Sequence, residues 1–137
     1  MPKTLIDSGP LIALFDGSDK YHTTTVNFLR EFKGQLVTSW AVMTEVSHML
    51  DFNLQVQLDF MQWVELGAVT LAHIEQQELF TVRKMMEKYT NVPMDLADAS
   101  LLYLAERENI QRIATIDRDF YIYRTKKKTL LKNVLTV

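Results

Sequence analysis

A short β-strand passes directly into a helix in the segment Thr4-Leu5-Ile6-Asp7-Ser8-Gly9-Pro10-Leu11-Ile12-Ala13-Leu14-Phe15. The β-like run at residues 4–6 ends at Asp7. Ser8 or Gly9 can cap a helix that has Pro10 in its first turn, where the missing N–H costs no hydrogen bond. This arrangement predicts the start of an α/β fold and places Asp7 at the carboxyl end of the first strand.

The alternation of strands and helices continues along the chain. Further strands are expected at residues 36–38, 68–71 and 112–115, and helices at residues 21–32, 54–66, 75–89 and 94–108, with one more helix capped by Ser39. The tail from Phe120 onward is expected to form a short strand pair around residues 126–128. Strands separated by helices need crossover connections, so we predict a three-layer α/β/α sandwich with a mainly parallel central sheet.

The composition is that of one folded domain spanning residues 1–137. A hydrophobic content of 47% excludes disorder, and a net charge of −2 excludes a uniformly basic nucleic-acid coat. The chain contains no cysteine, which excludes disulfides and zinc–thiolate sites. Asp7 interrupts the first apolar run, so no signal peptide is expected. No run of about 18 apolar residues occurs, so no membrane span is expected, and the predicted location is cytoplasmic.

Two aspartates follow separate strands of the predicted sheet. Asp7 comes after the first strand and Asp117 after the strand at residues 112–115. The carboxyl ends of parallel strands meet at one edge of a sheet, where ligands bind in such folds. Either aspartate alone is more simply explained as the cap of a helix or turn.

Two further acids lie inside apolar helical stripes. Glu45 shares its stripe with Val42, Val46 and Met49, and Asp98 shares its stripe with Met94, Leu101, Leu102 and Ala105. No Arg or Lys stands three or four residues from either acid, whereas Asp95 can lie beside Asp98. Because unpartnered buried carboxylates are costly and repel one another, the four acids favour a site for Mg²⁺ or Mn²⁺, which prefer oxygen ligands.

A cluster of carboxylates around a divalent cation suits the hydrolysis of phosphodiesters. The cation can activate a water molecule and neutralise charge on the phosphate, while one carboxylate accepts the proton of the water. No nucleophilic side chain is then needed. This agrees with the lack of cysteine and of any recognisable Ser–His–Asp constellation.

Four motifs together resemble a known family. They are Leu5-Ile6-Asp7-Ser8-Gly9-Pro10-Leu11-Ile12-Ala13-Leu14, Val42-Met43-Thr44-Glu45, Asp95-Leu96-Ala97-Asp98-Ala99-Ser100 and Thr115-Ile116-Asp117-Arg118-Asp119-Phe120. In this order they resemble the PIN domain, in particular the VapC-type ribonuclease toxins of bacterial and archaeal toxin–antitoxin pairs. The resemblance covers nearly the whole chain.

The resemblance implies a Mg²⁺- or Mn²⁺-dependent endoribonuclease. Its catalytic and metal-binding acids would be Asp7, Glu45, Asp98 and Asp117, with Asp119 as a further ligand. Ser8, Asp95 and Thr115 would support the site. The family further implies a homodimer, an RNA substrate and a cognate antitoxin that blocks the active site.

Other functions remain possible on the same residues. One is an RNA-processing nuclease outside a toxin–antitoxin pair, and another is a non-catalytic RNA- or protein-binding module whose acids only order the fold. An aspartyl-phosphate phosphatase is disfavoured because Gly9 stands where a second aspartate is needed. The Glu45–His48 spacing occurs in di-iron bundles, but the chain lacks a second copy.

The tail is basic and carries aromatic side chains. Contacts with an RNA backbone are expected from Arg118, Arg124, Lys126, Lys127 and Lys128. A solvated turn explains these side chains equally well. Trp40, Trp63 and Phe60 can belong either to the core or to a subunit interface, and the sequence does not decide between the two.

Overall fold

The structure is a computed structural model that describes residues 2–92, 94–117, 120, 123 and 130–136. Its sheet has the strand order β3-β2-β1-β4-β5. The strands are β1 (Lys3–Ile6), β2 (Gln35–Ser39), β3 (Thr70–Ala72), β4 (Arg112–Ala114) and β5 (Lys132–Asn133). Every pairing between these strands is parallel, so the predicted parallel sheet is confirmed.

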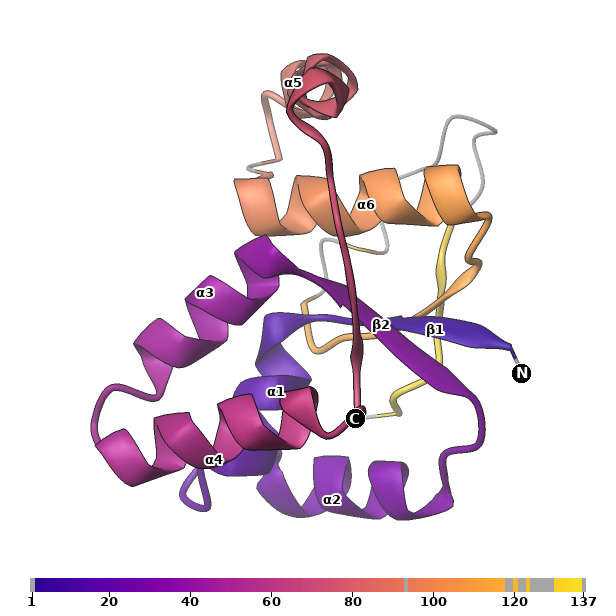
Figure 1. Ribbon diagram of the computed structural model, residues 1–137. Coiled ribbons are helices and arrows are strands. Elements are labelled where there is room, and N and C mark those ends of the chain that lie inside the picture. Colours follow the sequence, from indigo (N-terminus) through magenta and orange to yellow (C-terminus); the bar gives the residue numbers. More distant parts are fainter. Residues whose placement is uncertain (1, 93, 118–119, 121–122, 124–129, 137) are drawn as a thin grey trace.

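Helices cover both faces of this sheet. They are α1 (Ser8–Phe15), α2 (His22–Glu31), α3 (Trp40–Met49), α4 (Leu54–Glu65), the 3₁₀ turn η1 (Gln76–Glu78), α5 (Leu79–Lys88) and α6 (Leu96–Glu108). In Figure 1, α6 lies on one side of the sheet with α5 outside it, and α1, α2 and α4 lie on the other side. Helix α3 contacts both α1 and α6. The predicted three-layer fold is confirmed.

Side-chain caps fix where four helices begin, including α4, which is capped by Asn53. The Asp7 carboxylate caps α1 by accepting from the Ser8 backbone N–H at 2.8 Å, so the prediction that Ser8 or Gly9 provides the cap is wrong. Ser39 caps α3 as predicted, accepting from Val42 N. Asp95 caps α6, which therefore begins at Leu96 rather than two residues earlier.

Other boundaries differ from the sequence-based expectation. The helix predicted at residues 75–89 is divided into η1 and α5, with Glu75 and Glu78 forming a capping box at its start. Helix α4 ends before Gly67, as predicted, because Gly67 adopts a φ of +99°. Strand β3 consequently begins at Thr70 rather than at residue 68.

The strand pair predicted for the tail around residues 126–128 is not tested by the structure. Residues 124–129, which include the expected turn, lie outside the described part of the chain. Strand β5 pairs with β4, with Asn133 opposite Ile113. The end of the tail thereby adds an edge strand to the main sheet.

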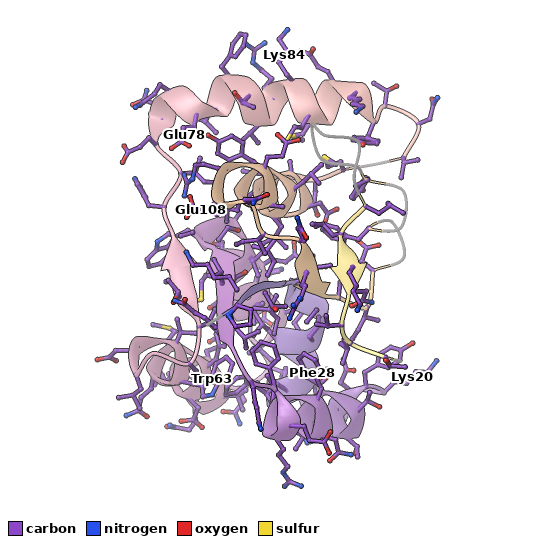
Figure 2. The ribbon with its side chains drawn as sticks, turned by 90° about the vertical axis from the view of Figure 1, so that its right-hand side faces the viewer. Lys20, Phe28, Trp63, Glu78, Lys84 and Glu108 are labelled. Carbon is purple, nitrogen blue, oxygen red and sulfur yellow. The ribbon has the colours of Figure 1, made fainter. Side chains whose placement is uncertain are left out.

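The core lies between the sheet and its two helical layers. Leu5, Ile6, Leu101 and Ile113 are fully buried along it. Below the sheet, Phe15 of α1 packs edge-to-face on Phe60 and on Trp63 of α4, each pair with ring centroids 5.4 Å apart. Phe28 and Trp63 both lie on this side in Figure 2 and pack against the core.

The three aromatic residues that the sequence left undecided differ in environment. Phe60 is fully buried and Trp63 is half-buried, so both belong to the core. Trp40 begins α3 with 59% of its surface exposed. A large exposed ring of this kind is available for contact with another molecule.

Above the sheet, a polar network fastens the start of α5 to α6. The Arg107 guanidinium donates to Glu78 Oε2 at 3.0 Å and to the backbone carbonyl of His73 at 2.7 Å. The Tyr103 hydroxyl donates to the same Glu78 carboxylate. Figure 2 shows Glu78 on this side of the sheet, whereas Lys84 of α5 points away from the body of the protein.

A helix that crosses a membrane is long and predominantly apolar. Within the described residues, no helix combines sufficient length with the apolar character needed to cross a bilayer.

The aromatic contact between α1 and α4 generates a stability prediction. We expect Phe60→Ala to lower the free energy of unfolding by about 3 kcal/mol, because it leaves a cavity beneath the sheet. Phe52→Ala is the matched control: this ring is 59% exposed, so its removal should change stability by less than about 0.5 kcal/mol. Urea denaturation followed by circular dichroism measures both, and equal effects would contradict the packing described.

Candidate metal centre

Three acidic side chains converge at the carboxyl edge of the sheet. Asp7 follows β1, Asp117 lies beyond the end of β4, and Asp98 lies in the first turn of α6. One carboxylate oxygen from each lies within 4.8 Å of the others. The fold thus brings together three of the four acids that the sequence singles out.

Asp7 is the most enclosed of the three and is held in one orientation. Its Oδ1 atom accepts from the Ser8 backbone N–H at 2.8 Å, and its Oδ2 atom accepts from the Thr115 hydroxyl at 2.9 Å. Burial raises the pKa of Asp7 to about 6, and the charges of Asp117 and Glu45 add to this effect. The two hydrogen bonds oppose the rise in pKa, because they favour the ionised carboxylate.

Asp98 is half-buried and lies beside several negative charges. Burial, followed by the charges of Asp7, Asp95 and Asp117, raises the pKa of Asp98 to about 8. Asp95 itself is exposed and accepts from the Asp98 backbone N–H at 2.8 Å, which is the bond that caps α6. Asp95 therefore contributes both a helix cap and a negative charge beside the cluster.

Glu45 lies next to the cluster but outside the three-acid group. The Ser8 hydroxyl donates to Glu45 Oε1, and the same hydroxyl oxygen lies 3.5 Å from Asp7 Oδ1. Ser8 thus connects the Glu45 carboxylate on α3 to the Asp7 carboxylate at the end of β1. The sequence placed Glu45 in an apolar helical stripe and Ser8 among the supporting residues, but it did not show that the Ser8 hydroxyl contacts both carboxylates.

Thr115 connects Asp7 with the segment that carries Asp117. Its hydroxyl donates to Asp7 Oδ2 and accepts from the Asp117 backbone N–H at 2.9 Å. The Thr115 backbone is in turn hydrogen-bonded to the side chain of Asn133, which sequence reasoning missed. A single asparagine in the tail carries no sequence signal for such a role.

A second residue without an assigned role lies at the junction of two helices. The Ser100 hydroxyl of α6 is 2.7 Å from the hydroxyl of Ser39, the residue that caps α3. Ser100 also donates to the Ala97 carbonyl. This buried contact fixes α3, which carries Glu45, against α6, which carries Asp98.

Several predicted site residues cannot be placed. Asp119 and the basic side chains Arg118, Arg124, Lys126, Lys127 and Lys128 lie outside the described residues.

The donor set fits a hard divalent cation. Three carboxylates that share a half-buried site repel one another when all are ionised, and a cation relieves this repulsion. Among the described residues, no ion pair joins Asp7 or Asp98 to a Lys or Arg side chain. Oxygen-only ligation favours Mg²⁺ or Mn²⁺ over metals that prefer nitrogen or sulfur.

The burial of Asp98, together with the neighbouring negative charges, predicts a pH-dependent stability for the metal-free protein. The folded-state pKa of Asp98, about 8, exceeds the ordinary value of 3.8, so the folded protein binds the extra proton. The associated stability is present below about pH 4 and is lost as the pH rises through 8. We expect Asp98→Asn to raise the free energy of unfolding by about 1 kcal/mol at pH 8. The gain is this small because solvent screens the charge of a half-buried group. It corresponds to an increase of roughly 3 °C in melting temperature.

Thermal melts in EDTA at pH 4.5 and pH 8 test this prediction. The gain from Asp98→Asn should be small at the lower pH, where the wild-type carboxyl already carries its proton. Asp51→Asn, at an exposed position away from the cluster, should change neither melting temperature. An equal gain at both pH values would show that ionisation of the Asp98 carboxyl is not the cause.

Comparisons with known proteins agree with this geometry. The family model of the PIN domain matches residues 4–126. The chain is 28% identical over 116 residues to Ribonuclease VapC26 of Mycobacterium tuberculosis (strain ATCC 25618 / H37Rv), a match covering 83% of this chain and 86% of that protein. The crystal structure of Mycobacterium tuberculosis VapC20, described as a Sarcin-Ricin loop cleaving toxin, superposes with a TM-score of 0.79 at 16% identity, covering 87% of this chain and 93% of that one. The resemblance indicated by the sequence motifs is confirmed, and the chain belongs to the PIN-domain family.

Proposed function

We propose that this protein is a Mg²⁺- or Mn²⁺-dependent endoribonuclease and the toxin of a type II toxin–antitoxin pair. The observation that carries the proposal is the convergence of the Asp7, Asp98 and Asp117 carboxylates within 4.8 Å at the carboxyl edge of the sheet. Membership of the PIN-domain family and the similarity to Ribonuclease VapC26 support RNA as the substrate.

The three carboxylates would hold the cation. When bound, Mg²⁺ or Mn²⁺ lowers the pKa of a water molecule and neutralises negative charge that develops on the phosphate. Asp7 contributes a rigid ligand because its two oxygens are fixed by the Ser8 N–H and the Thr115 hydroxyl. Asp98, whose pKa is about 8, must release its proton on binding the cation, so we infer that cation affinity increases between pH 6 and 8.

Glu45 is suited to accepting a proton rather than to holding the cation. Its carboxylate is oriented by the Ser8 hydroxyl and lies beside the three-acid group rather than within it. We assign Glu45 the role of accepting a proton from the attacking water, with the cation held mainly by the three aspartates. Asp119 remains a candidate ligand from the segment that follows β4.

The proposed partners are RNA, a second copy of the chain and a cognate antitoxin, in the cytoplasm. An open apolar groove of about 320 Å³ lies between α3, η1, α5 and α6 and supports protein–protein contact. Its rim includes Trp40, Leu79 and Leu96, each about half exposed or more. The basic side chains at residues 118, 124 and 126–128 are proposed to attract the RNA backbone.

Cleavage of RNA is the direct test of this function. We expect purified protein, freed of any antitoxin, to produce discrete fragments from a mixed RNA pool in the presence of Mn²⁺ or Mg²⁺. EDTA should abolish cleavage, and Asp98→Asn should lower it at least about 100-fold, because both remove the cation from the cluster. Asp51→Asn, which makes the same chemical change at an exposed position, should leave cleavage unchanged.

The outcomes separate the competing functions. RNA that stays intact with a folded protein that binds Mn²⁺ would contradict a general endoribonuclease. Failure to bind Mn²⁺ as well would favour a non-catalytic binding module. Cleavage without growth arrest on expression of the chain would indicate an RNA-processing nuclease rather than a toxin.

The position of Glu45 outside the three-acid group generates a further prediction. We expect Glu45→Gln to lower the rate of RNA cleavage at least about tenfold, because a carboxamide cannot accept the proton. Its Mn²⁺ affinity should fall less than that of Asp98→Asn, since the Glu45 carboxylate lies outside the three-acid group. Calorimetric Mn²⁺ titration beside the cleavage assay checks this, and an equal loss of affinity in both variants would instead make Glu45 a principal ligand.

A further inference from the structure

The side chain of Asn133 continues the sheet beyond the end of its strands. Strand β4 ends at Ala114 and β5 ends at Asn133, which is paired with Ile113. The next hydrogen bonds come from the Asn133 carboxamide. Its Oδ1 atom accepts from the Thr115 backbone N–H at 3.2 Å, and its Nδ2 atom donates to the Thr115 carbonyl at 3.0 Å.

Asparagine is chemically suited to this contact. Its planar carboxamide offers a donor and an acceptor on the same side, as the N–H and C=O of one residue do in a β-strand, and therefore satisfies both backbone groups of Thr115 at once. Aspartate lacks the donor and alanine lacks both groups. At Thr115, the first residue after β4, these two side-chain hydrogen bonds replace the backbone hydrogen bonds that a longer β5 would make.

Asn133 is itself firmly anchored. The Val134 backbone N–H donates to the Ile113 carbonyl at 2.8 Å, and the Leu135 N–H donates to Asn133 Oδ1 at 3.1 Å. Leu131 and Leu135 on either side are buried in the core. The carboxamide is thus a fixed point to which Thr115 is attached.

Thr115 transmits this constraint to the acidic cluster. Its hydroxyl donates to Asp7 Oδ2 and accepts from Asp117 N, so a change in the Thr115 backbone affects both acids. We propose that Asn133 is a positioning residue that holds Thr115, and through it Asp7 and Asp117, in the arrangement that binds a divalent cation. The inference rests on the proposed function for its catalytic consequence, but the cation affinity can be tested separately.

A double-mutant cycle measured by Mn²⁺ affinity tests the inference. Free Mn²⁺ in titrations of the metal-free protein is followed by electron paramagnetic resonance. We expect Thr115→Val, which removes only the hydroxyl, to weaken Mn²⁺ binding about tenfold, and Asn133→Ala to weaken it roughly three- to tenfold. Since Asn133 acts through Thr115, the double variant should bind Mn²⁺ about as weakly as Thr115→Val alone.

Activity provides a second measurement that a purely structural role would not reproduce. At limiting Mn²⁺, kcat for RNA cleavage by Asn133→Ala should fall in proportion to the lost affinity, with KM for RNA unchanged. Asn27→Ala, on the exposed surface of α2, is the matched control and should alter neither quantity. If Asn133→Ala does not fold, Asn133→Gln replaces it in the cycle, because glutamine keeps the carboxamide but displaces it by one methylene.

The results distinguish this inference from the function on which it rests. The positioning role would be overturned if the double variant lost Mn²⁺ affinity by the product of the two single fold-losses. It would also be overturned if Asn133→Ala bound Mn²⁺ as tightly as the wild type. Wild-type protein that binds Mn²⁺ without cleaving RNA would overturn the proposed function and leave the positioning role standing. Wild-type protein that binds no Mn²⁺ would overturn both.

Discussion

The carboxylates of Asp7, Asp98 and Asp117 repel one another when they are ionised, and the fold has to hold them together against this repulsion. The three acids approach within 4.8 Å, and burial raises the pKa of Asp7 to about 6 and of Asp98 to about 8. Such an arrangement persists only where the surrounding fold is stable enough to hold it. Here a fully parallel sheet with helices on both sides brings the acids together from two strand ends and one helix start.

The same hydrogen bonds build the helices and orient the acids. Asp7 caps α1 and also belongs to the cluster, and Asp95 caps α6 through the backbone of Asp98. Ser39 caps α3 and contacts Ser100 of α6, which fixes the helix of Glu45 against the helix of Asp98. Because capping stabilises the fold by about 1 kcal/mol per helix, it offsets part of the repulsion that the cluster introduces.

The acidic cluster therefore destabilises the protein when no cation is bound, and the surrounding sheet and helices offset this cost. A divalent cation at the three carboxylates relieves the repulsion, so cation binding and folding stability are linked through Asp98 and its proton. From the edge strand β5, the Asn133 side chain holds Thr115, and the Thr115 hydroxyl holds Asp7. This link is consistent with a metal-dependent nuclease whose geometry is set before the substrate arrives.

Local sequence patterns determined the order of strands and helices, the parallel sheet and the identity of the acids, because apolar periodicity and strand-to-helix junctions are encoded over a few residues. Only the tertiary structure decided which acids meet and which stands apart. The bond from Thr115 to Asp7 spans 108 residues of chain and that from Asn133 to Thr115 spans 18, so both depend on the strand order. The place of Glu45 depends likewise on the Ser8 hydroxyl, 37 residues away along the chain, because contacts between distant segments leave no local pattern in the sequence.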